Sequence, residues 1–168
     1  MPPRIARGRP PAPPLLGPFA QYSPYAWLLP EELWNKPKRT FAYSVEFVTP
    51  NQLVATGTRT RGQGVDRDSM FACVAVAATV TNVDNTTFID SPAILVQITT
   101  GTSTNWFEPA AHFLNVFGRG AVGDGRINYL ELPRLIDPGA NISVTLENLD
   151  ATARHVRLAF RGFRVYGM

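Results

Sequence analysis

The sequence predicts an all-β fold: an antiparallel β-sandwich or jelly roll over residues 39–168, preceded by a long, extended, Pro-rich N-terminal arm over residues 1–38. Two observations predict the sandwich. Apolar and polar residues alternate in several short segments after Thr40, and turn residues separate these segments at roughly regular spacing. A third observation predicts the arm: ten of the fifteen prolines lie in the first 38 residues, where they disfavour regular helices and sheets.

The arm combines its prolines with many large apolar side chains. Its one helical signal is PEELW, Pro30 to Trp34, with proline at the first position and two glutamates in the first turn. Ordering so many backbone residues costs more than the apolar side chains return unless another surface receives them. We therefore expect the arm to become ordered in grooves of other subunits. The alternatives are a disordered tail and a proline-rich ligand, PPAPP, for an aromatic groove.

The residues expected to bind partners all lie in this arm. Arginines near its start are expected to make ionic contacts, and the aromatic residues that follow are expected to enter pockets of neighbouring subunits. The predicted partner-binding residues are Arg4, Arg7, Arg9, Phe19, Tyr22, Tyr25, Trp27 and Trp34.

Three strands are predicted in the first half of the sandwich. Residues 41–48, FAYSVEFV, alternate, with Phe41, Tyr43, Val45 and Phe47 on one face. Residues 56–68 are polar and contain glycine, so a loop is expected there. Residues 71–83 are small or β-branched on both faces, which predicts a strand covered on both sides, and residues 93–100 form the next strand.

The second half begins with an irregular stretch. Residues 102–125 show no clear period, whereas residues 126–132 alternate again. A turn is predicted at Pro138-Gly139, followed by a strand whose inward residues are Ile142, Val144 and Leu146.

The last strand follows the segment NLDATAR, and we expect it to form a hairpin with the strand before that segment. Val156, Leu158 and Phe160 share one face of the last strand. Its apolar residues then change from even to odd positions at Phe163, which we interpret as a one-residue bulge at Gly162.

Little in the sequence points to catalysis or to a bound cofactor. Cys73 is the single cysteine, which excludes an internal disulfide and a cysteine-pair zinc site, and the two histidines match no metal-ligand spacing. Residues 118–125, GRGAVGDG, contain G-x-G-x-x-G, but no helix-length segment follows, so no dinucleotide site is predicted. We predict no catalytic, cofactor-binding or metal-binding residue.

Charge and hydropathy narrow the possible partners. The net charge is +3, and the basic residues are spread over the arm, residues 59–67 and the last strand, so nucleic-acid binding is not expected. No apolar run of about 18 residues occurs, so no membrane span is expected.

The C-terminal part, from about residue 110, resembles small structural proteins of tailed-phage virions. The shared pattern is a strand phrase around P-G followed by a final strand ending F-x-G-F-R-V. The positions that carry it are Pro133, Leu135, Ile136, Pro138, Gly139, Ile142, Val144, Leu146, Asn148, Phe160, Gly162, Phe163, Arg164 and Val165.

The resemblance implies a non-enzymatic protein that decorates or cements an icosahedral phage capsid. Its partners would be the major capsid protein and other virion subunits, and it would form dimers or trimers on the particle. Such a protein is made in the host cytoplasm and resides in the virion.

Other functions stay open at this point. Neck, collar and tail proteins of virions use similar sandwiches. A carbohydrate-binding module is the second alternative, because Trp106 and Phe107 could stack on a sugar ring. An enzyme on a jelly-roll scaffold is the third.

Overall fold

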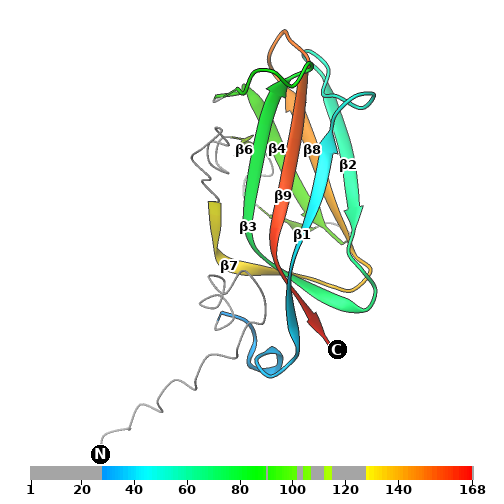
Figure 1. Cartoon of the computed structure of the whole chain (residues 1–168), viewed down its shortest axis with the longest axis vertical. Helices are drawn as coiled ribbons and strands as arrows, with labels where there is room; N and C mark the ends of the chain where they lie inside the picture. Colours follow the sequence, from blue (N-terminus) through cyan, green and yellow to red (C-terminus); the bar gives the residue numbers. More distant parts are fainter. Residues whose placement is uncertain (1–27, 90, 102–103, 107–111, 115–127, 168) are drawn as a thin grey trace, which may run out of the picture.

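The structure, a computed structural model, describes residues 28–89, 91–101, 104–106, 112–114 and 128–167. As predicted, the fold is all-β, with two antiparallel sheets (Figure 1). Sheet A has the strand order β1-β9-β3-β7; sheet B has the order β2-β8-β4-β5, and β6 also pairs with β4. The elements are η2 Glu31–Leu33, β1 Lys38–Phe47, β2 Thr58–Gly64, β3 Ser69–Asn82, β4 Ile94–Thr100, β5 Thr104–Asn105, β6 His112–Phe113, β7 Asn128–Ile136, β8 Asn141–Asn148 and β9 Arg154–Tyr166.

The main hydrophobic core lies between the two sheets, and alternating side chains from both sheets fill it. The predicted inward residues are buried there: Tyr43, Val45 and Phe47 in β1, and Ile142, Val144 and Leu146 in β8. Phe41 shares their face but is partly exposed, because it lies beyond the core under the guanidinium of Arg164, 4.8 Å from the ring centroid.

β9 runs through two different apolar environments. Val156, Leu158 and Phe160 belong to the main core, whereas Phe163 and Val165 belong to a second cluster. The β9–β1 register is unbroken from Phe47↔Val156 to Lys38↔Val165, so β9 has no bulge beside β1. The change from even to odd positions therefore marks a change of face along one continuous strand.

The predicted bulge exists but lies in the neighbouring strand. Cys73 of β3 pairs with Gly162 and Ala75 pairs with Arg161, so Val74 is the extra residue. A Cβ at Gly162 would lie 1.9 Å from the carbonyl oxygen of Ala72, so the bulged strand approaches β9 too closely for any side chain. Gly162 thus marked the position of the bulge correctly, but the extra residue lies in β3 and not in β9.

β3 is covered on both faces, as its sequence predicted. Every residue from Ser69 to Val76 is buried. Phe71, Cys73 and Val76 face the main core, and Met70, Ala72, Val74 and Ala75 face the second cluster.

The expected loop at residues 56–68 is wrong, because residues 58–64 form strand β2 at the edge of sheet B. Its register places Arg59, Arg61 and Gln63 on the face of β8 that carries the core residues. Arg61 donates from Nη1 to the carbonyl oxygen of Glu46, 2.8 Å away on β1. Inward-facing charged residues are typical of protected edge strands, so polarity here indicated an edge and not a loop.

The expected hairpin of the last two strands is also wrong. β8 pairs with β2 and β4, and β9 pairs with β1 and β3, so residues 149–153 cross from one sheet to the other. The buried Asn148 supports the crossing: its Nδ2 donates to the carbonyl oxygens of Val54 (3.0 Å) and Thr152 (2.8 Å), and its Oδ1 accepts the Asp150 N–H. A strand with one apolar face fits either connection, which is why alternation alone did not separate them.

The strand predicted at 126–132 runs later, as β7 from Asn128 to Ile136. Of the irregular stretch 102–125, the structure describes the short strands β5 and β6 and a few adjoining residues.

The close approach at Gly162 gives a test of the bulge. Gly162→Ala should lower the free energy of unfolding by about 1–3 kcal/mol or more, since the new Cβ meets backbone that cannot move away freely. Gly64→Ala is the matched control, because nothing lies within 4 Å of its Cβ position. That variant should keep the wild-type stability or gain up to about 1 kcal/mol. Urea unfolding measures both, and equal stability of the two variants would contradict the bulge geometry.

Candidate assembly interface

A second apolar cluster covers the outer face of sheet A at the end where β9 finishes. The segment that precedes β1, residues 28–37, lies on this face, and we call it the strap. Its side chains Leu29 and Leu33 are buried, with exposed fractions of 4% and 3%. They pack against Met70, Ala72, Val74, Ala75, Phe163 and Val165.

Backbone and side-chain hydrogen bonds hold the strap in a compact shape. The Leu33 N–H donates to the carbonyl oxygen of Pro30 (2.9 Å), which closes the short 3₁₀ turn that PEELW predicted. Trp34 packs against the cluster, and its Nε1 donates to the carbonyl oxygen of Leu29 at 2.9 Å. At the end of the strap, the Tyr166 N–H donates to the carbonyl oxygen of Pro37 at 3.0 Å, which extends the ladder between β1 and β9.

Lys38 fastens the strap to the start of β1. Its Nζ donates to the carbonyl oxygens of Trp34 (2.7 Å) and Lys36 (2.9 Å). Partial burial lowers the pKa of Lys38 from its usual value, because removal from water disfavours the charged form.

The strap corrects one part of the sequence interpretation. We expected the whole arm, residues 1–38, to find its contacts on other subunits. Leu29, Leu33 and Trp34 instead contact this chain's own sheet. The physical reason is the pair Phe163 and Val165, which would otherwise leave the outer face of sheet A apolar and uncovered.

The other predicted partner-binding residues lie outside the described part of the chain. These are Arg4, Arg7, Arg9, Phe19, Tyr22, Tyr25 and Trp27. Trp34 is thus the one member of the set that the structure places, and it packs against the second cluster of its own chain.

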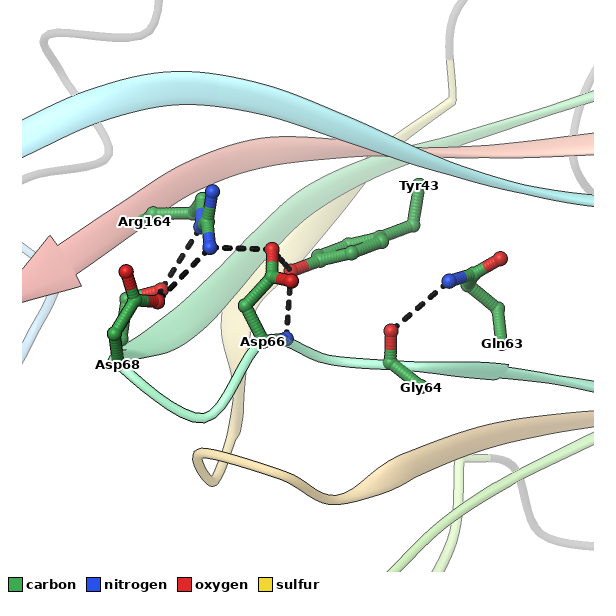
Figure 2. A network of polar contacts seen from close by, with 7 residues as sticks. Tyr43, Gln63, Gly64, Asp66, Asp68 and Arg164 are labelled. Atoms are coloured by element: carbon green, nitrogen blue, oxygen red, sulfur yellow. Dashed lines mark hydrogen bonds and ion pairs between the residues drawn. The ribbon is translucent and has the colours of Figure 1, made fainter.

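A polar network closes the same end of the sandwich on the inner face (Figure 2). Arg164 follows Gly162 on the inner face of β9, where the main core ends. Its Nη2 forms ion pairs with Asp66 and with Asp68, the latter at 3.0 Å, and its Nε donates to Ser69 Oγ at 2.8 Å. Planar guanidinium is suited to several acceptors at once, so one residue ties β9 to the connection between β2 and β3.

Tyr43 links this network to β1. Its hydroxyl donates to Asp66 Oδ2 at 3.0 Å and accepts the Asp66 N–H at 3.1 Å. Burial, more than any other effect, raises the pKa of Tyr43 above its usual value, so the hydroxyl keeps its proton at neutral pH. The hydrogen bonds and ion pairs of Tyr43 and Arg164 thus join β1, β9 and the connection between β2 and β3 at this end of the sandwich.

His155 lies in a hydrogen-bonded structural site at the other end of β9. The backbone N–H of Thr49 can only donate, so His155 Nε2, 3.2 Å away, accepts. Nδ1 therefore carries the proton and donates to Asn85 Oδ1 at 3.0 Å. Both ring nitrogens of His155 therefore form hydrogen bonds, which gives this side chain a structural role near the start of β9.

Edge strand β7 carries the most exposed apolar surface near the strap. Leu132 is 65% exposed, and Tyr129 and Leu135 are 42% and 37% exposed. Beside it lies a cavity of about 480 Å³ lined by Trp106, Leu130, Glu131, Leu132, Pro133 and Arg134. An Nη2 of Arg134 donates to the carbonyl oxygen of Trp106 at 2.9 Å, which joins β7 to the end of β5.

Trp106 does not present its ring to a sugar. It is 3% exposed and meets Phe160 edge to face, with ring centroids 5.6 Å apart, and its Nε1 donates to Thr100 Oγ1 at 3.3 Å. Trp106 is therefore a core residue, which corrects the stacking role considered for it. Phe107 lies outside the described residues.

Groups that could support chemistry are constrained where the structure describes them. Cys73 is buried, and burial raises the pKa of its thiol well above the usual range, which disfavours a reactive thiolate. Within the described ranges, no three His, Cys, Asp or Glu side chains are placed to hold one metal ion. No helix in the same part of the chain has the length and apolar character needed to cross a bilayer.

No family model, curated protein or solved structure matches this chain. The resemblance to virion proteins is therefore carried by the residues quoted above and stays a prediction.

Truncating Leu33, one of the two buried leucines of the strap, tests whether the strap belongs to this fold. Leu33→Ala should lower the free energy of unfolding by about 2–5 kcal/mol, as for other buried leucines. Leu28→Ala is the control, since Leu28 is 43% exposed; its stability should stay within about 0.5 kcal/mol of wild type. Chemical denaturation of the full chain measures both variants. The docked strap is refuted if Leu33→Ala is as stable as Leu28→Ala.

Proposed function

We propose that this chain is a non-enzymatic structural subunit of a phage virion that decorates or cements the capsid. In this proposal the sandwich rests on the shell and residues 1–27 form an extended arm that binds neighbouring subunits. Its partners are the major capsid protein and further copies of this chain. The action is mechanical, because contacts added across subunit boundaries stabilise the shell.

The order of the strands supports this proposal. The short strands β5 and β6 both pair with β4, and we count them together as the fifth strand, so that β7, β8 and β9 become the sixth, seventh and eighth. The strand orders of the two sheets are then 1-8-3-6 and 2-7-4-5. Two Greek keys wound into a jelly roll have this order, and the jelly roll is common among viral capsid and lectin domains. We therefore propose a jelly roll as the finer description of the two sheets.

The observation that carries the proposal is the docked strap. Leu29 and Leu33 fix residues 28–37 to sheet A, so the residues before Leu28 start from a defined point at one end of the sandwich. Extended proline-rich chain advances ~3.1 Å per residue, so residues 1–27 can reach roughly 80 Å from that point. A firmly held base is what a tether needs if tension on the arm is to reach the sandwich.

Neck, collar and tail positions fit the same geometry and differ from the shell only in the partner. The carbohydrate-binding alternative loses its main support, since the Trp106 ring is buried in the core. The strand order fits both roles, so the preference for an assembly role rests on the strap and on the burial of Trp106.

Deletion of residues 1–27 tests the function. Shells assembled from the major capsid protein of the same virion are incubated with the full chain or with residues 28–168, then sedimented. We expect the full chain to co-sediment and the deletion to bind at least about tenfold more weakly, since the predicted arm contacts are lost.

Thermal unfolding serves as the control, because the deletion keeps the strap and should keep the melting temperature of the full chain. Equal binding by both chains would refute the tether. Binding only to isolated necks or tails would move the protein to those positions on the virion.

A further inference from the structure

The outer face of sheet B is polar but almost free of charge. The strand registers place every second residue of β2, β8 and β4 on this face, together with Asn105 of β5 and Phe113 of β6. Its polar side chains are mainly hydroxyls and amides, among them Thr60, Gln97, Thr99, Asn105, Ser143 and Thr145. Among the described residues of this face, Glu147 alone is charged. Soluble proteins usually intersperse charges of both signs over their surfaces, so this composition is unusual for a solvated face.

A small apolar area lies among these polar groups. Leu95 of β4 pairs with Phe113 on one side and with Glu147 of β8 on the other. Phe113 is 51% exposed and Glu147 is also exposed, whereas Leu95 between them is half-buried. Neighbouring strands lie about 4.8 Å apart, so the backbones of Phe113 and Glu147 are roughly 10 Å apart. This spacing leaves room above Leu95 for one sugar ring.

Hydrogen-bonding side chains form the next row across the same face. Thr145 of β8 pairs with Gln97 on β4 and with Thr60 on β2. Gln97 Nε2 donates to Asn105 Oδ1 at 3.1 Å, and the hydroxyls of Thr60 and Thr145 share a hydrogen bond of 2.8 Å. A hydroxyl can donate once and accept twice, and an amide has two donor hydrogens and an acceptor oxygen. These contacts therefore orient the side chains and leave them capacity for further hydrogen bonds.

We propose that Phe113, Leu95, Glu147, Gln97 and Thr145 form a binding site for a neutral saccharide. The C–H face of a sugar ring packs on Phe113 and Leu95, because that face is apolar. The ring hydroxyls donate to the Glu147 carboxylate and exchange hydrogen bonds with Gln97 and Thr145. The site is separate from Trp106, which belongs to the core between the sheets. Saccharide binding is additional to the assembly role and does not rest on it.

The charge of the face selects a neutral ligand. A nucleic acid or an acidic peptide needs cationic side chains, and among the described residues of this face there is none to pair with it. A basic peptide would meet Glu147 alone, and a single exposed ion pair contributes little to affinity. A saccharide needs both donors and acceptors in close array, and hydroxyls and amides supply both.

The size of the face disfavours a second copy of this chain as its occupant. Four neighbouring strands, with β2 seven residues long, cover roughly 20 Å in each direction, or about 400 Å². A stable protein pair buries about 800 Å² on each partner. The face is therefore too small for a stable dimer and suits an oligosaccharide of a few rings.

A glycan array tests the site with the full chain. The fluorescently labelled chain is applied to printed neutral and acidic oligosaccharides. The neutral oligosaccharide with the strongest signal is then titrated by isothermal calorimetry into the wild type and two pairs of variants. Phe113→Ala removes the stacking ring, and Phe88→Ala is its control, since Phe88 is 42% exposed but lies outside sheet B. Glu147→Gln and Glu46→Gln form the second pair, because both carboxylates are exposed and Glu46 belongs to sheet A.

We expect binding of neutral oligosaccharides that Phe113→Ala weakens at least about tenfold and Glu147→Gln about fivefold. Phe88→Ala and Glu46→Gln should bind as tightly as the wild type. Absence of any oligosaccharide signal would overturn the inference, as would binding confined to acidic oligosaccharides or equal losses in a variant and its control. Glu147→Gln preserves the size of the side chain, so the site is still tested if Phe113→Ala folds poorly.

Sedimentation velocity distinguishes a saccharide site from an interface between copies. We expect Phe113→Ala to sediment as the wild type does over the same range of concentrations. Self-association of the wild type that Phe113→Ala abolishes, and Phe88→Ala does not, would assign the face to a second copy and overturn the inference.

Discussion

The need to cover both faces of sheet A where β9 ends shapes much of this structure. Before Gly162 the inner face of β9 is apolar and its outer face carries Arg157 and Arg161. After Gly162 the outer face is apolar and the inner face carries Arg164. The outer residues Phe163 and Val165 then require a cover, which the strap provides. The inner residue Arg164 requires acceptors, which the connection between β2 and β3 provides. The strap on the outer face and the connection between β2 and β3 on the inner face thus cover the two sides of sheet A at this end of the sandwich.

The sequence predicted the parts of the fold that depend on local alternation. The inward faces of β1 and β8 and the double burial of β3 followed from their patterns, because one-sided and two-sided burial leave different periods. The alternation patterns did not predict which strands pair with one another in each sheet. Asn148 ends a strand equally well before a hairpin or before a crossing, and the polar β2 resembles a loop unless its edge position is known. Such choices depend on contacts between distant segments, which no short window contains.

The sequence predicted which kinds of residue make up the candidate interface better than it predicted where those residues lie in the fold. Prolines and aromatics predicted that residues 1–38 form an anchoring segment, which stays a prediction for residues 1–27, and PEELW correctly marked the short helical turn. The boundary between strap and arm was missed, although the parity change at Phe163 signalled an apolar outer face in need of a cover. The exposed apolar surface of β7 had no comparable signal, because the register of β7 against β3 depends on a bulge in each strand.

The contact between the strap and the last described residues gives the molecule a polarity. Lys36 Nζ donates to the carbonyl oxygen of Gly167, so both lie at one pole, while the loop after β3 and the crossing after β8 lie at the other (Figure 1). A foreign domain inserted at residues 84–87 would leave the strap pole untouched. If the proposed function holds and the chain is tethered through the strap pole, residues 84–87 would face the surrounding medium.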